Sequence, residues 1–141
     1  MNELATQTSV TIDAAVDDVW KALTTPSAIE RWFFGVRTET DWLPGNPIVH
    51  TGEWQGKPYQ DKGTILRIEP PTLLVHTHWS PTSGLPDEPE NYEEVRWELA
   101  ERDGGTELTL RETNLASEEA KAVSEQAWAT VLGNLKQLLE S

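Results

Sequence analysis

The C-terminal segment carries the pattern that most limits how this chain can fold. Its apolar residues recur at helical spacing, at Trp128, Val131, Leu132, Leu135, Leu138 and Leu139. Ser117 can cap such a helix, and Glu118 and Glu119 suit its positively polarised first turn. At about 1.5 Å per residue, roughly 24 helical residues span about 36 Å. One long helix is therefore expected to end the chain, and its apolar face needs a surface to cover.

The residues before this helix predict mainly strands. Apolar and polar residues alternate, with turn clusters between them, over residues 4–13, 48–54, 64–69, 73–79, 92–101 and 106–113. Two short helices, over residues 17–25 and 27–32, are expected after the first strand. The links at residues 70–71 and 103–105 are short, which favours antiparallel neighbours, whereas residues 80–91 predict a long loop.

Sheet and helix differ in width, and this difference predicts a cavity. Six or seven strands about 4.8 Å apart make a sheet on the order of 30 Å wide, whereas a helix with its side chains is about 10 Å across. The sheet must curl around the helix, use the short helices as a lid, or keep an internal space. We therefore expect a single α+β domain over residues 1–141, with a curved antiparallel sheet of six to seven strands around the C-terminal helix.

Five sequence segments resemble a known family. They are Thr11 to Thr24 followed by Ile29 to Phe33, then Gly63 to Pro71 with Leu74 to Thr77, and Gly105 to Leu110. These segments resemble START-like domains of the polyketide cyclase (SRPBCC) superfamily, and in particular a single-domain form of the activators of the heat-shock-protein-90 ATPase. The resemblance implies the helix-grip fold. It leaves the function open, because the superfamily includes lipid carriers, hormone receptors, cyclases, self-sacrificing resistance proteins and co-chaperone domains.

Two histidines are the first candidates for contact with a ligand. His76 and His78 share one face of their strand with Leu74. Proteins of the resembled family often carry large aromatic residues at the matching positions. The pair could bind a carbonyl or share a proton, or both rings could be solvated or satisfied by backbone groups. A metal would need a third ligand such as His50, and we expect neither a metal nor a cofactor.

Aromatic residues supply the other candidates for the cavity wall. The full predicted ligand-binding set is Trp32, Phe33, Trp54, Tyr59, His76, His78, Trp97 and Trp128. Rings of this kind line pockets or pack in the core, and the sequence leaves both roles open.

Several functional classes have no signature in the chain. There is no Cys, and the sequence lacks a G-x-S-x-G motif, a phosphate loop, an H-E-x-x-H motif and a dinucleotide fingerprint. An enzyme built on this chain would depend on His76, His78, Tyr59 or a buried carboxylate as acid or base. Strand carboxylates such as Glu112 are expected mostly to face water.

Charge narrows the choice of partners. The formal net charge is −13, which disfavours nucleic acid and anionic membranes. Residues Asp87 to Glu107 hold nine acidic side chains against two Arg, and this segment, with Glu93 among its exposed charges, is either a solvated face or a docking site for a protein. The N-terminus has no pattern of a secretory signal and no segment is long and apolar enough to span a membrane, so a cytoplasmic location is expected.

The leading hypothesis is the binding of a small, largely apolar or aromatic molecule between the sheet and the C-terminal helix. One alternative is a cyclase-like or hydrolase-like enzyme that uses the same cavity. The other is a co-chaperone-like domain that binds a protein through its surface.

Overall fold

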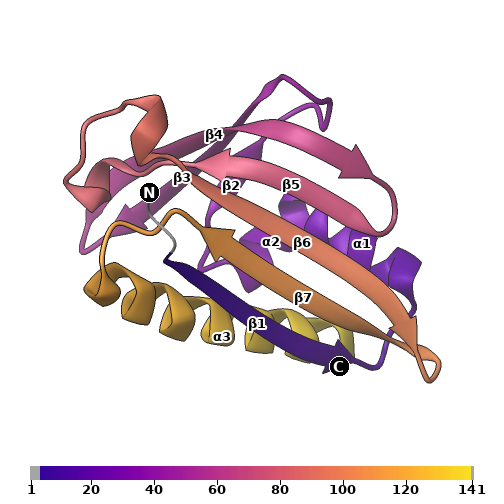
Figure 1. Cartoon of the computed structure of the whole chain (residues 1–141). Coiled ribbons are helices and arrows are strands. Elements are labelled where there is room, and N and C mark those ends of the chain that lie inside the picture. Colours follow the sequence, from indigo (N-terminus) through magenta and orange to yellow (C-terminus); the bar gives the residue numbers. More distant parts are fainter. Residues whose placement is uncertain (1–3, 141) are drawn as a thin grey trace.

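The computed structural model describes residues 4–140 and confirms the α+β helix-grip fold. Seven strands form one antiparallel sheet in the order β1-β7-β6-β5-β4-β3-β2. The strands are β1 (Ala5–Ile12), β2 (Arg37–Glu39), β3 (Pro47–Trp54), β4 (Lys57–Glu69), β5 (Leu73–His78), β6 (Glu93–Arg102) and β7 (Gly105–Thr113). The helices are α1 (Val16–Leu23), α2 (Pro26–Trp32) and α3 (Glu118–Glu140). All three helices lie on one side of the curved sheet, with α3 alongside β1 (Figure 1).

Local sequence explains where the long helix begins and which face it buries. The backbone N–H of Ala120 donates to the Ser117 hydroxyl at 3.1 Å, which is the expected N-terminal cap. Val131, Leu132 and Leu135 are buried against the sheet and the short helices. None of the helices in residues 4–140 is long and apolar enough to cross a membrane.

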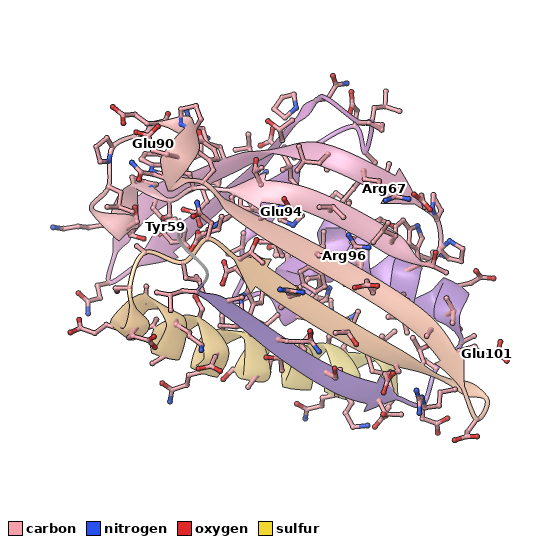
Figure 2. All side chains as sticks on the ribbon, viewed as in Figure 1. Tyr59, Arg67, Glu90, Glu94, Arg96 and Glu101 are labelled. Carbon is pink, nitrogen blue, oxygen red and sulfur yellow. The ribbon has the colours of Figure 1, made fainter. Side chains whose placement is uncertain are left out.

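The core lies between the concave face of the sheet and the helices. Its most deeply buried members include Ile12, Val19, Ile65, Val95, Leu108, Leu110, Val131 and Leu135. The convex face is polar, and Figure 2 shows Arg67, Glu94 and Arg96 on this outer side, away from the helices.

Strand boundaries differ from the sequence prediction around β4. This strand begins at Lys57 rather than at residue 64, because Gln55 and Gly56 alone make the turn from β3, both with positive φ. Residues 59–63 do not alternate between apolar and polar side chains. The reason is that the side of this segment that faces the helices lies against polar groups. The three-residue strand β2 was not predicted, and the 80–91 loop contains two short 3₁₀ turns, Pro81–Ser83 and Pro89–Asn91.

A glycine permits the close contact between β4 and β5. A Cβ atom on Gly63 would lie 1.8 Å from the carbonyl oxygen of Thr77, so no other residue fits without moving a strand. This approach brings Asp61, two residues earlier on β4, to the end of β5 at His78.

Candidate functional site

A cavity of about 630 Å³ lies between the concave face of the sheet and helices α2 and α3. Its lining includes side chains of every strand from β2 to β7. Phe34 and Val123 also line it and are 61% and 67% exposed, so the cavity reaches the surface between the end of α2 and α3.

Four aromatic rings form one wall of the cavity, and we call them the aromatic quartet: Trp32, Phe33, Trp97 and Trp128. Each ring contacts two others, with centroid separations of 5.7 Å for Trp32–Phe33, 5.8 Å for Trp32–Trp97, 6.1 Å for Phe33–Trp128 and 5.7 Å for Trp97–Trp128. The indole N–H of Trp32 donates to the carbonyl oxygen of Ala22 at 3.0 Å. Because each ring is held by its neighbours, the quartet presents a preformed apolar surface.

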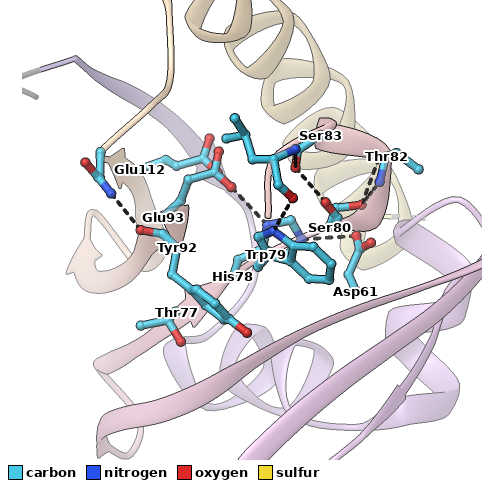
Figure 3. A network of polar contacts seen from close by, with 12 residues as sticks. Asp61, Thr77, His78, Trp79, Ser80, Thr82, Ser83, Tyr92, Glu93 and Glu112 are labelled. Carbon is cyan, nitrogen blue, oxygen red and sulfur yellow. Dashed lines mark hydrogen bonds and ion pairs between the residues drawn. The ribbon is translucent and has the colours of Figure 1, made fainter. Parts of the chain in front are cut away.

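The opposite part of the lining is polar, and we call Asp61, His78, Glu93 and Glu112 the polar end of the cavity. His78 Nε2 donates to Asp61 at 3.0 Å and Nδ1 donates to Glu93 at 3.2 Å. Figure 3 shows these two carboxylates on either side of the ring, with Glu112 next to Glu93. Glu112 accepts a hydrogen bond of 2.9 Å from the indole N–H of Trp128, which joins the polar end to the aromatic quartet.

Strand register explains why these residues meet. His78 lies opposite Glu93 in the β5–β6 pair, and Glu112 lies opposite Val95 in the β6–β7 pair. Two-residue periodicity then places Glu93 and Glu112 on the concave face together with the core residues of their strands. The expectation that Glu93 and Glu112 face water is therefore wrong: Glu112 is 3% exposed, and the Glu93 side chain is 24% exposed and bonded to His78.

The environment of His78 keeps its imidazole protonated. Burial by itself lowers the pKa of His78, but the hydrogen bonds to Asp61 and Glu93 and the charges of these two carboxylates outweigh it and raise the pKa to about 10. Both N–H groups of His78 are already used by these carboxylates. At neutral pH the ring is thus a fixed cation rather than a proton acceptor.

His76 is also fully engaged. Its Nδ1 donates to the carbonyl oxygen of Thr77 at 3.0 Å, and its Nε2 accepts from the indole N–H of Trp97 at 3.2 Å. Burial lowers the pKa of His76 to about 4, so the ring is neutral. His76 thus holds the Trp97 indole in the quartet, and both of its ring nitrogens are engaged.

His50 is a cavity residue that the sequence mentioned only as a possible third metal ligand. Its Nδ1 shares a hydrogen bond of 2.9 Å with the Thr38 hydroxyl, and its ring meets Phe33 edge-on at 5.8 Å. Burial, followed by the neighbouring His76 and His78, lowers the pKa of His50 to about 3. The His50 and His78 rings are 6.4 Å apart, but the engaged nitrogens of His76 rule out a site made of the three imidazoles.

Seven of the eight predicted residues line this cavity: Trp32, Phe33, Tyr59, His76, His78, Trp97 and Trp128. The side chain of the eighth, Trp54, lies outside the described part of the structure. The sequence prediction missed Trp42, Asp61, Glu93 and Glu112. For Glu112 a signal was present, because it follows Leu108 and Leu110 at two-residue spacing on one strand face.

Apart from Glu93, the predicted acidic segment has mostly exposed side chains. Two of its acids pair with the two Arg of the segment, Glu98 with Arg96 at 3.0 Å and Glu107 with Arg102 at 3.2 Å. Glu90 and Glu94 are exposed, on the loop and on the outer face (Figure 2).

A curved antiparallel sheet that holds one long helix over an aromatic-lined cavity defines a START-like helix-grip protein. The family described as Activator of Hsp90 ATPase homolog 1-like protein matches residues 13–140, and the chain belongs to this family.

Solved structures agree with this assignment. The solution structure of ChR145 from Cytophaga hutchinsonii is 40% identical with a TM-score of 0.85, and the match covers 99% of this chain and 96% of that one. The crystal structure of CalU16 from Micromonospora echinospora is 30% identical with a TM-score of 0.75, covering 96% and 75% of the two chains. The Aha1 dimer from Colwellia psychrerythraea has the same fold at 18% identity, with a TM-score of 0.78 and coverage of 97% and 96%. A comparison with curated proteins found no match.

Proposed function

We propose that this protein binds a small, largely apolar or aromatic molecule in the cavity between the sheet and α3. The observation that carries the proposal is the aromatic quartet, which forms a preformed wall of a cavity of about 630 Å³. Ligand sites of this kind usually measure roughly 300 to 1,000 Å³ and combine apolar walls with a few polar groups. A ligand that buries about 200 Å² of apolar surface would gain roughly 5 kcal/mol before ordering costs.

The protonation states of the histidines favour binding over acid–base catalysis. A general acid or base works best with a pKa near the working pH. The pKa values of His50 and His76 lie far below neutrality at about 3 and about 4, and that of His78 lies far above it at about 10. Glu112, whose pKa is raised by burial and by the nearby Glu93, is the carboxyl group that an enzymatic role would use.

The test is calorimetric titration with 1-naphthylmethanol, a neutral aromatic probe, of the wild type and of two variants. Ala127 is exposed on α3 and lines the cavity, whereas Ala129 is exposed on the same helix and does not line it. Ala127→Trp is expected to weaken binding at least about tenfold, equivalent to about 1.4 kcal/mol, while Ala129→Trp leaves it unchanged. Absence of saturable binding to the wild type, or equal affinity in the three proteins, would show that the cavity is not the binding site.

A further inference from the structure

The charged side chains that line the cavity are mostly negative. Four carboxyl groups line it, those of Asp61, Glu93, Glu112 and Glu119, and none of the described lining residues is Lys or Arg. His78 is the one lining residue in residues 4–140 that is held as a cation. Three of the four carboxyl groups gather at the polar end, so one imidazolium faces up to three negative charges there.

Hydrogen bonding at the polar end shows the same imbalance. Both N–H groups of His78 are occupied by Asp61 and Glu93, so the ring has no donor left for a ligand. The Asp61 Oδ1 atom is buried and has no hydrogen-bond partner in the part of the chain that the structure describes. Buried polar atoms are usually paired, and an unpaired carboxylate oxygen needs a donor. The polar end thus offers acceptors and negative charge, and the missing component is a group that donates hydrogen bonds and carries positive charge.

The space next to this polar end is compact. The nearest ligating atoms of His78, Glu93 and Glu112 lie within 4.8 Å of one another. His50 is 8% exposed, lines the same cavity, and is held at Nδ1 by the Thr38 hydroxyl. A single ammonium group has three donors, which suits the carboxylates of Glu93 and Glu112 converging at this distance.

The aromatic quartet adjoins the polar end through the hydrogen bond of 2.9 Å between Trp128 and Glu112. The faces of Trp and Phe rings attract cations, by about 0.5 to 2 kcal/mol for each contact. A ligand carboxylate would meet like charges and would find neither Lys nor Arg among the described lining residues, so an anionic ligand does not fit this cavity.

We propose that the ligand is an amine: an apolar or aromatic body that packs on the aromatic quartet and carries a protonated amino group that binds Glu93 and Glu112. This inference rests on the proposed binding function and adds the charge class of the ligand. The same carboxylates make anionic amphiphiles such as fatty acids the least favoured ligands.

Three probes that share one ring system test this proposal. They are 1-naphthylmethylamine, 1-naphthylmethanol and 1-naphthoate, each titrated into the wild-type protein by calorimetry. The amine is expected to bind at least about tenfold more tightly than the alcohol, and the naphthoate more weakly than the alcohol. Binding of the alcohol without a preference for the amine would overturn the proposal that the ligand is a cation. The proposed binding function would then still hold. Absence of binding by all three would overturn the proposed function itself.

Two charge-neutralising variants test whether the carboxylates of the cavity cause the preference for the amine. Glu112→Gln keeps an oxygen that can accept from the Trp128 indole and removes the charge, so it is expected to reduce the preference for the amine about tenfold while affinity for the alcohol is retained. Glu94→Gln removes a charge from the exposed face of β6 and is expected to leave the preference unchanged. Equal loss in both variants would mean that the overall charge of the protein, rather than the cavity, selects the amine.

Titration with metal ions tests whether the site binds an inorganic cation instead of an organic one. His78, Glu93 and Glu112 are the described residues whose spacing could also hold a metal ion. Zinc chloride and manganese chloride are titrated alone and then in competition with 1-naphthylmethylamine. We expect no saturable metal binding at the concentrations where the amine saturates. Tight metal binding that excludes the amine would overturn the proposal and identify the cluster as a metal site.

Discussion

The bonded state of His78 predicts how the stability of the protein depends on pH. The pKa of His78 is about 10 in the folded protein against an ordinary value of 6.5, because Asp61 and Glu93 hold the protonated ring. A raised folded pKa stabilises the native state fully below the unfolded pKa, and this stabilisation is lost as the pH rises through the folded pKa. The contribution of His78 is therefore expected to decline between pH 6.5 and about pH 10.

The magnitude follows from the same two values. Each pH unit inside this window is worth about 1.4 kcal/mol for a single group. The His78 side chain is 22% exposed, so solvent screens part of the interaction. Between about pH 7 and about pH 9 we expect the contribution of His78 to the free energy of unfolding to fall by roughly 2 to 3 kcal/mol.

Urea unfolding of the wild type and of His78→Gln at these two pH values measures the effect. The stability difference between the two proteins is expected to be larger at the lower pH, since only the wild type gains from the protonated ring. Lys62→Gln is the control, because this exposed cation pairs with Asp87, lies on the face of β4 opposite to Asp61, and has a raised pKa that lies above the pH window. A difference between wild type and His78→Gln that does not change with pH would refute the assigned protonation state.

Three further perturbations test the packing and the surface. Trp128→Ala is expected to lower the free energy of unfolding by about 3 to 5 kcal/mol in urea unfolding, since it removes a member of the aromatic quartet; a loss below about 1 kcal/mol would contradict this role. Gly63→Ala is expected to cost more than about 2 kcal/mol, because its Cβ would collide with a carbonyl of β5, and near-neutral behaviour would show that β4 and β5 can separate freely. Replacing the exposed Glu88, Glu90 and Glu94 by Gln is expected to leave the calorimetric affinity for 1-naphthylmethanol unchanged; a collapse of affinity would place these carboxylates in the binding site.

Much of the fold could be predicted because each element carries a local signal. The apolar stripe of α3, its Ser117 cap and the alternation in β6 and β7 depend on neighbours along the chain, and the structure has these elements at nearly the predicted residues. The strand β2 has only three residues, Arg37–Glu39, which is too short for a period to be recognised.

The polar end of the cavity could be predicted only in part, because it depends on register. Placing the start of the strand at residue 64 rather than at Lys57 hid the two-residue hairpin at Gln55 and Gly56, and this hairpin sets His50 opposite Asp61. The contact between Asp61 and His78 depends in addition on how β4 meets β5, where the register shifts between Ile65 and Arg67. An irregularity of this kind has no local pattern in the sequence.

A crystal structure of the protein with bound 1-naphthylmethylamine tests the central claim most directly. We expect the naphthyl ring against Trp97 and Trp128, and the amino group within hydrogen-bonding distance of Glu93 and Glu112. A probe bound on the convex face of the sheet, or aromatic side chains that close the cavity and leave no room for the probe, would contradict it.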